Sequence, residues 1–73
     1  MRVPSIRPRK VIQILKRAGF EEVRQTGSHL ILVNKERKKV VPIPMHAKDI
    51  KRGLLVSIIK QSGLTVYEFM KLL

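Results

Sequence analysis

Apolar side chains recur at helical spacing close to the N-terminus. They occupy positions i, i+3, i+4 and i+7 of one helical face: Val11, Ile14, Leu15 and Ala18. Pro8 suits the first turn of a helix, because the amide proton that it lacks is not needed there, and Gly19 supplies a stop. The pattern therefore predicts a helix over residues 8–18 that buries one apolar face.

The next part of the chain has the composition and alternation of β-strands. Residues 20–26 contain β-branched and aromatic side chains with weak alternation, which predicts a short strand. Gly27 is then expected to turn the chain into a second strand over residues 28–33. Strand geometry places the side chains of this second strand on two faces: Leu30 and Leu32 on one, and His29, Ile31 and Val33 on the other.

A third strand is predicted over residues 39–43, after the polar connection 34–38. Short connections between consecutive strands favour antiparallel hairpins. Pro42 has no amide proton to donate to a β-ladder, so this strand is expected at an edge of the sheet, and Pro44 is expected to end it.

The C-terminal third returns to helical spacing. A basic connection over residues 45–52, with a helical turn near Asp49, is expected before a second helix. The apolar face of this helix ends at Gly63 and consists of Leu55, Ile58, Ile59 and Ser62. Thr65 and Glu68 have the spacing of a capping box, which predicts a last short helix with Phe69, Leu72 and Leu73 as its apolar side chains.

These elements define an α+β fold in the order α-β-β-β-α with a short C-terminal helix. Three consecutive strands predict an antiparallel three-stranded sheet, and the apolar helix faces are expected to cover one face of it. The opposite face is left open to a partner. His29 is expected on that open face.

The net charge of the chain indicates which class of partner it binds. The 73 residues, enough for a single domain (1–73), contain 16 Lys and Arg against 5 Asp and Glu, a net charge of +11. Solubility of a small domain needs a net charge of only about 2 to 8, so the excess favours a polyanionic partner. Nucleic acid is the first candidate, and a membrane surface or an acidic protein follows.

Several classes of site are disfavoured by the residues that the chain lacks. Without cysteine there are no disulfides or thiolate ligands, which is compatible with the cytoplasm, and the two histidines and five acids have no recognisable zinc spacing. No metal and no cofactor are therefore expected. The apolar runs are too short for a signal peptide or for a membrane span of about 20 residues, so no membrane association is expected.

His29 is the strongest candidate for chemistry. Strand alternation is expected to place Ser28 on the face opposite to His29, which argues against a Ser–His relay. Cleavage of RNA requires fewer catalytic groups, because the 2′-hydroxyl of the RNA is itself the nucleophile and a single imidazole is able to remove the proton of that hydroxyl. The alternative is that His29 is a bystander on a half-buried strand.

Basic side chains form two clusters along the predicted sheet. One lies at the second hairpin, and the other precedes the second long helix: Lys35, Arg37, Lys38 and Lys39, then Lys48, Lys51 and Arg52. Each cluster alone is compatible with a solvated face, but together they predict a track for a phosphate backbone. Gly27, Ser28, Arg24 and His46 complete the expected RNA contacts, and a substrate contact or a structural role is preferred for His46 over catalysis.

Four segments of the chain resemble the HicA toxins, the mRNA interferases of HicAB toxin–antitoxin systems. These segments are Ala18-Gly19-Phe20, Gln25-Thr26-Gly27-Ser28-His29, Val41-Pro42-Ile43-Pro44-Met45-His46, and Ile50-Lys51-Arg52-Gly53-Leu54 leading to Ile58-Ile59-Lys60-Gln61-Ser62-Gly63-Leu64. The resemblance implies a fold like that of double-stranded-RNA-binding domains and metal-independent cleavage of mRNA. It implies His29 as the catalytic residue and a HicB-type antitoxin as partner. The chain is expected to form a homodimer or a hetero-oligomer with that antitoxin. Leu54 departs from the threonine of many relatives.

Three hypotheses follow. The first is an endoribonuclease that acts as the toxin of a type II toxin–antitoxin system, and the second is a non-catalytic RNA-binding module. The third makes the charged surface a docking site for an acidic protein, with Ile31 and Val33 as apolar contacts, and it is compatible with the first.

Overall fold

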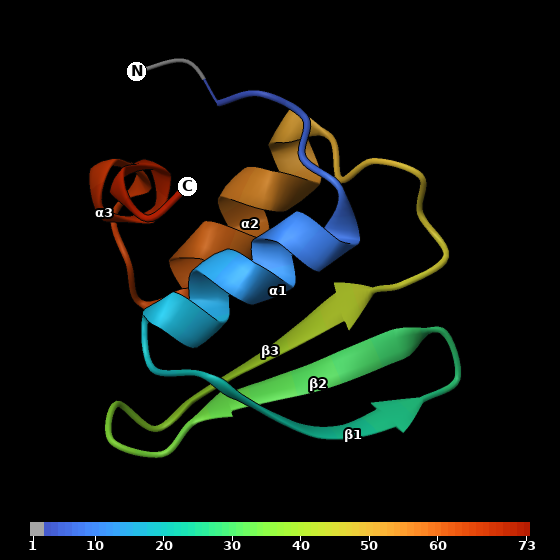
Figure 1. The fold of residues 1–73 in the computed structure, drawn as a ribbon, viewed down its shortest axis with the longest axis vertical. Helices are drawn as coiled ribbons and strands as arrows, with labels where there is room; N and C mark the ends of the chain where they lie inside the picture. The colour runs from blue at the N-terminus through green and yellow to red at the C-terminus, as the bar shows by residue number, and fades with distance from the viewer. Residues whose placement is uncertain (1–2) are drawn as a thin grey trace.

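A computed structural model of the chain describes residues 3–73. Met1 and Arg2, which begin the segment in which no signal peptide is expected, lie outside this range. The elements are α1 (Pro8–Arg17), β1 (Glu21–Thr26), β2 (His29–Asn34), β3 (Lys39–Pro44), α2 (Arg52–Ser62) and α3 (Val66–Lys71) (Figure 1). This order confirms the predicted α+β class. The likeness to double-stranded-RNA-binding domains stays a prediction.

The sheet has the order β1-β2-β3, and both pairs of neighbours are antiparallel. β3 is an edge strand, as its Pro42 predicts. His29 is paired with Thr26 of β1 and with Pro44 of β3, so these three residues form a row at one end of the sheet. The turn between β1 and β2 and the loop after β3 extend from this same end (Figure 1).

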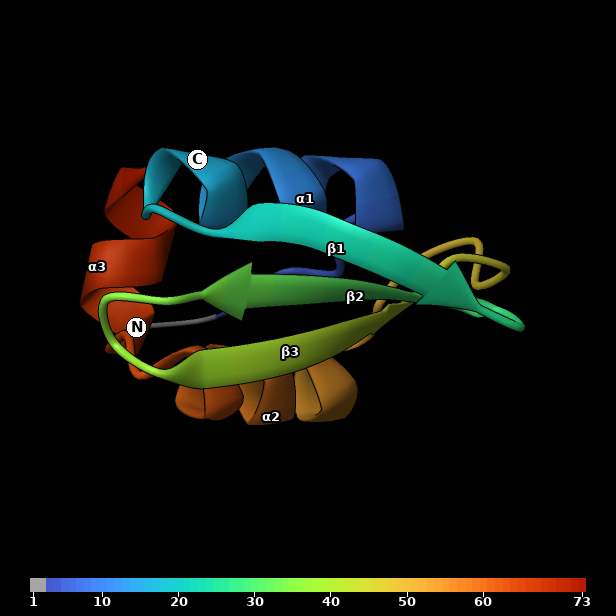
Figure 2. The ribbon, with the colours of Figure 1, turned by 90° about the horizontal axis from the view of Figure 1, so that it is seen from below.

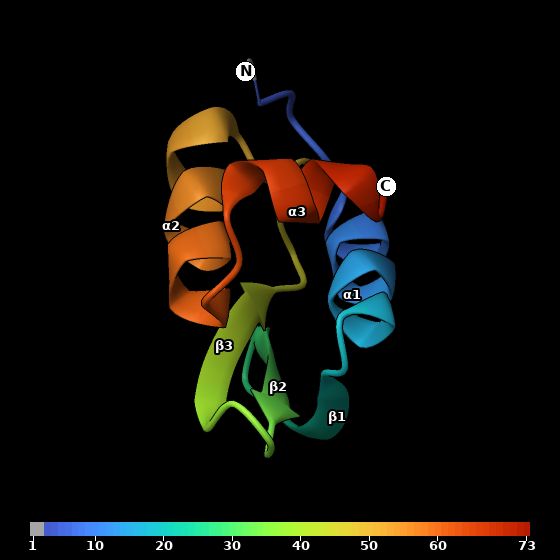
Figure 3. The same cartoon turned by 90° about the vertical axis from the view of Figure 1, so that its left-hand side faces the viewer.

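The helices all lie on one side of the sheet, and the other side is open (Figure 3). β2 alternates as predicted, because Leu30 and Leu32 are buried towards the helices while His29 is exposed. Leu30 and Leu32 pack with the apolar helix faces in one core. The fully buried members of this core include Val11, Ile14, Leu15, Val41, Ile43, Leu55 and Phe69. The predicted open face is therefore confirmed.

β1 differs from its neighbours, because all six of its side chains are exposed. The weak alternation of residues 20–26 has this physical basis: an edge strand held by backbone pairing needs no apolar face of its own. A register shift between Glu22 and Arg24 adds a β-bulge, and an ion pair between Glu22 and Lys16 of α1 ties the strand to the helix layer.

The ends of the C-terminal helices follow the sequence signals. Gly63 ends α2 in the left-handed conformation (φ +81°), and Thr65 and Glu68 form the predicted capping box. The Glu68 amide donates to Thr65 Oγ1 (3.1 Å) and the Thr65 amide donates to Glu68 Oε1 (2.9 Å). Because the charged carboxylate accepts the Thr65 amide proton, the pKa of Glu68 is lowered.

The connection after β3 does not contain the helical turn predicted near Asp49. Ile50 instead pairs with Ile6 in an antiparallel bridge, with N–H to O distances between the backbones of 3.1 and 2.7 Å. The helical expectation is wrong because Ile50 is fully buried, and its backbone groups find their partners in the N-terminal segment rather than in a local turn. Val3 and Ile6 join the core through this pairing, which no local pattern indicates.

Within residues 3–73, the helices are all too short or too polar to cross a membrane.

Candidate functional site

His29 begins β2 immediately after the turn at Gly27 and Ser28. Gly27 has φ +58°, a backbone conformation that favours glycine, although a Cβ there would meet no atom within 4 Å. The need for glycine is therefore conformational rather than spatial. The imidazole of His29 is exposed on the open face, where it is accessible to a large ligand.

Ser28 and His29 lie closer than predicted. The Ser28 Oγ is 3.4 Å from His29 Nδ1, which contradicts the expectation that the two side chains point to opposite faces. That expectation is wrong because Ser28 belongs to the turn, so strand alternation starts only at His29. The contact engages Nδ1 and leaves Nε2 of the ring for a ligand. Among residues 3–73 no carboxylate bonds the ring as the third member of a catalytic triad would.

Two further predicted residues share the His29 end of the sheet. Arg24 is paired with Ile31, so it lies on the open face diagonally across from His29, at about 7–8 Å between Cα atoms. His46 is exposed in the loop after β3. That loop is held against the turn at Gly27 and Ser28, because the Met45 amide donates to the Ser28 carbonyl oxygen at 2.7 Å.

The hairpin cluster lies at the opposite end of the sheet. Lys35, Arg37 and Lys38 are in the turn between β2 and β3, and Lys39 begins β3. Six residues of extended strand, at about 3.3 Å each, separate this turn from His29, so the distance is about 20 Å. Figure 2 shows the two turns at opposite ends of the molecule. The structure therefore does not bring these four cations to the imidazole.

Asn34 fixes the hairpin and was not predicted as a structural residue. Its side chain is 4% exposed, its Nδ2 donates to the Ala18 carbonyl (3.3 Å), and its Oδ1 accepts from the Arg37 amide (3.1 Å). A polar residue at the end of an apolar strand is the only signal for this role in the sequence. It links the end of α1 to the hairpin.

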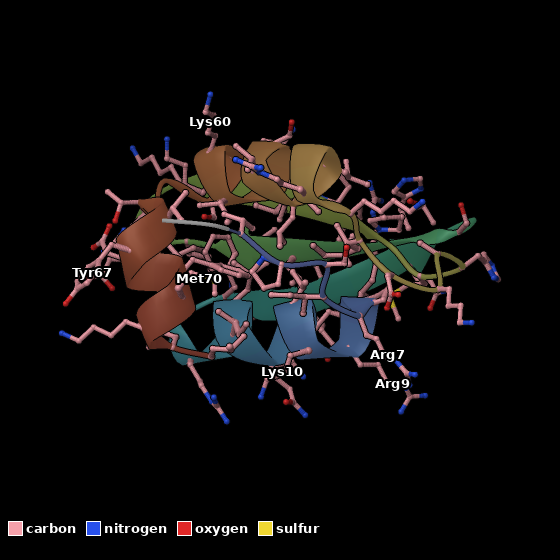
Figure 4. The ribbon with its side chains drawn as sticks, turned by 90° about the horizontal axis from the view of Figure 1, so that it is seen from above. Arg7, Arg9, Lys10, Lys60, Tyr67 and Met70 are labelled. Atoms are coloured by element: carbon pink, nitrogen blue, oxygen red, sulfur yellow. The ribbon has the colours of Figure 1, made fainter. Side chains whose placement is uncertain are left out.

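Arg7 and Arg9 are cations at the His29 end that the sequence analysis does not single out. They flank Pro8 at the beginning of α1, and their side chains reach outward together (Figure 4). With Pro8, Met45, Ala47 and Lys48 they line a hollow of about 430 Å³. The run Arg7-Pro8-Arg9-Lys10 was the available signal, but the helical periodicity directs attention to the apolar face instead.

Most of the positive charge on residues 3–73 is not neutralised by ion pairs. The one ion pair found in residues 3–73 joins Lys16 of α1 to Glu22 of β1. Over the same residues, no group of three or more His, Cys, Asp and Glu side chains comes together as a metal site would require.

Fold and site together define a small, strongly basic α+β protein whose uncovered sheet presents an exposed imidazole beside a hydroxyl and a guanidinium. Over residues 8–64 the chain matches the family model described as the HicA toxin of bacterial toxin–antitoxin systems. This match spans more than half of the sequence and includes Gly27, Ser28 and His29, and the chain belongs to the HicA toxin family. The comparison with curated proteins found no match.

Proposed function

We propose that this toxin is an endoribonuclease that cleaves mRNA with His29 as its acid/base. The observation that carries the proposal is the exposed imidazole at the beginning of β2, with Ser28 Oγ 3.4 Å from Nδ1 and Arg24 on the same face. Membership of a toxin family supports a cytotoxic activity for such a site.

In the proposed reaction His29 removes the proton of a ribose 2′-hydroxyl. The 2′-oxygen then forms a bond to the adjacent phosphorus while the bond from phosphorus to the 5′-oxygen breaks. The leaving 5′-oxygen takes up a proton from solvent, so the products are a 2′,3′-cyclic phosphate and a 5′-hydroxyl. We assign to Arg24, which shares the open face of the sheet with His29, the stabilisation of the charge that develops on the phosphoryl oxygens.

Substitution of His29 by alanine tests the role of the imidazole. We expect the rate of RNA cleavage to fall by about 10²–10⁴-fold, the usual contribution of a general acid or base, because no other group occupies that position. The measurement is single-turnover cleavage of a labelled mRNA, with growth arrest on induction as a second readout. The thermal midpoint should stay within a few degrees of the parent value, because the side chain is exposed.

His46→Ala is the matched control, since it removes the other imidazole at the same end of the sheet. It should keep most of the activity. An all-deoxy substrate should remain uncut, and a chelator should leave cleavage unchanged. If His29→Ala cuts RNA as fast as the parent protein, the mechanism is wrong.

The second candidate is a non-catalytic RNA-binding module. It is favoured by the hairpin cations, which lie about 20 Å from His29 and therefore cannot serve the chemistry directly. This function predicts binding that weakens steeply with salt and yields no product. Cleavage that scales with the concentration of pure protein and disappears in His29→Ala would exclude it.

We also propose a HicB-type antitoxin as the protein partner, bound on the open face of the sheet. Val40 is 58% exposed there, and Ile31 and Val33 are half-buried beside it, which gives the face an apolar centre. With a net charge of +11 around that centre, an acidic partner surface fits best. Occupancy of this face would also cover His29.

A further inference from the structure

The hollow at the beginning of α1 is anchored to the turn that carries His29. Met45 lines the hollow, and its amide donates to the carbonyl oxygen of Ser28 at 2.7 Å. Pro44, the preceding residue, is paired with His29. One hydrogen bond and one strand pairing therefore connect the backbone of the hollow to the backbone around the proposed catalytic residue.

The three cations of the hollow lie on backbone that is held in place. The bridge between Ile6 and Ile50 fixes the residue before Arg7 and the residue two after Lys48. The Arg7 carbonyl accepts from the amides of Lys10 (3.0 Å) and Val11 (3.1 Å), and this fixes the first turn of α1 below Arg9. Cations on such a backbone lose less conformational freedom on binding than cations on a free tail.

No carboxylate lines the hollow. Asp49 follows Lys48 in the sequence but is not among the lining residues, and the ion pair of the described chain is formed by Lys16 and Glu22 elsewhere. Glu22 lines the adjoining hollow together with Arg9 and Met45, but its carboxylate is paired with Lys16. The mutual repulsion of the three cations is therefore relieved when an anion binds between them.

The lining also indicates which part of a nucleic acid binds there. Arginine and lysine side chains are donors only, and the remaining lining residues Pro8, Met45 and Ala47 provide no aromatic ring on which a base is able to stack. Such a surface favours phosphate oxygens over base edges, because the phosphates carry the negative charge that attracts three clustered cations. Arginine in particular matches the geometry of a phosphate with two parallel donors.

We propose that this hollow is a backbone subsite for RNA, in which Arg7, Arg9 and Lys48 hold a phosphate on the strand whose scissile phosphate lies at His29. The inference rests on the proposed function and extends it: the strand passes over the end of the sheet and the loop after β3, and not along the sheet towards the hairpin cluster. The subsite acts without sequence preference and contributes to KM rather than to kcat.

The test compares two double variants that each remove two positive charges. Arg7→Gln/Arg9→Gln removes charge from the hollow, and Lys60→Gln/Lys71→Gln removes it from the last turns of α2 and α3. Lys60 lies far from Arg7 and Arg9 (Figure 4), and neither Lys60 nor Lys71 lines the hollow. Both are made in the His29→Ala background, so that RNA stays intact, and binding of a labelled single-stranded RNA is measured by anisotropy over a range of salt concentrations. The same pairs in the His29 protein are assayed for cleavage.

We expect Arg7→Gln/Arg9→Gln to weaken RNA binding by about tenfold or more at low salt. It should also reduce the slope of log affinity against log salt by about 0.7, the contribution of one phosphate contact on a single strand. A DNA strand of the same sequence should lose as much affinity, because the phosphates are shared. The control pair should change both quantities by less than half as much, and cleavage by the hollow variant should show a raised KM with kcat retained.

Equal losses in the two double variants would overturn the subsite, because the effect would then be one of net charge. Unchanged RNA binding together with lost antitoxin binding would also overturn it and would make the hollow a protein-docking surface. These outcomes do not depend on catalysis. Failure of the parent protein to cleave RNA would instead overturn the proposed function and leave the binding result to decide the subsite.

Discussion

At the scale of single residues, the contact between Ser28 and His29 has the largest consequence for chemistry. A hydroxyl 3.4 Å from Nδ1 restrains the rotation of an exposed ring, and when Nδ1–H donates to Ser28 Oγ the other ring nitrogen, Nε2, is unprotonated and able to take up a proton. We predict that Ser28→Ala lowers kcat by about three- to tenfold, because a hydrogen bond contributes about 0.5–1.5 kcal/mol and 1.36 kcal/mol corresponds to a factor of ten in rate. KM should change little. Steady-state kinetics on a short RNA checks this.

Ser28→Thr is the control for that substitution, since threonine keeps the hydroxyl and should restore most of the rate. A serine-to-alanine variant as fast as the parent protein, or a threonine variant as slow as alanine, would show that the hydroxyl does not orient the ring. The same contact explains an error of the sequence analysis. Alternation holds only within the strand, so counting Ser28 as its first residue assigned that one side chain a face that the turn does not impose, while the faces from His29 onward were right.

At the scale of elements, Asn34 joins α1 to the hairpin between β2 and β3. We predict that Asn34→Ala lowers the free energy of unfolding by about 1–3 kcal/mol, because it leaves the Ala18 carbonyl and the Arg37 amide without their partner. Chemical denaturation measures the change. Lys35→Ala, an exposed neighbour, should stay within about 0.5 kcal/mol of the parent protein.

Cleavage by Asn34→Ala at a temperature where the variant is folded should equal that of the parent protein, because the hairpin is about 20 Å from His29. A stable variant that has lost activity would contradict this separation and would return the hairpin cluster to the substrate path.

The elements themselves were predictable because their signals are local. Periodicity over residues 8–18 predicts α1 to within one residue at its end, and the spacing of Thr65 and Glu68 predicts the capping box. The bridge between Ile6 and Ile50 was not predictable, since it joins segments 44 positions apart and neither has the length of a strand. The bridge also brings Arg7 and Arg9 close to Lys48, so the sequence analysis did not predict the hollow that these residues line.

At the scale of the whole molecule, helices protect one side of the sheet and the other is available to a partner. If an antitoxin binds there, Val40→Glu should weaken the complex at least about tenfold, because a charge would replace an apolar contact at the centre of the face. Titration calorimetry with a HicB-type antitoxin that binds the parent protein measures the affinity. Leu54→Glu, an equally charged change on an exposed residue of α2, should leave it within about threefold. Equal effects of the two changes would move the partner to another surface.

The exposure of β1 bears on how a protein of this kind diverges. None of its six side chains contributes to the core, so substitutions along this strand are nearly neutral for folding, while Arg24 and Thr26 stand beside the imidazole. New outward residues next to His29 can therefore be tolerated without disturbing the helices beneath the sheet. Over evolutionary time, paralogues would acquire different RNA preferences, or escape one another's inhibitors, by changing this ribbon first.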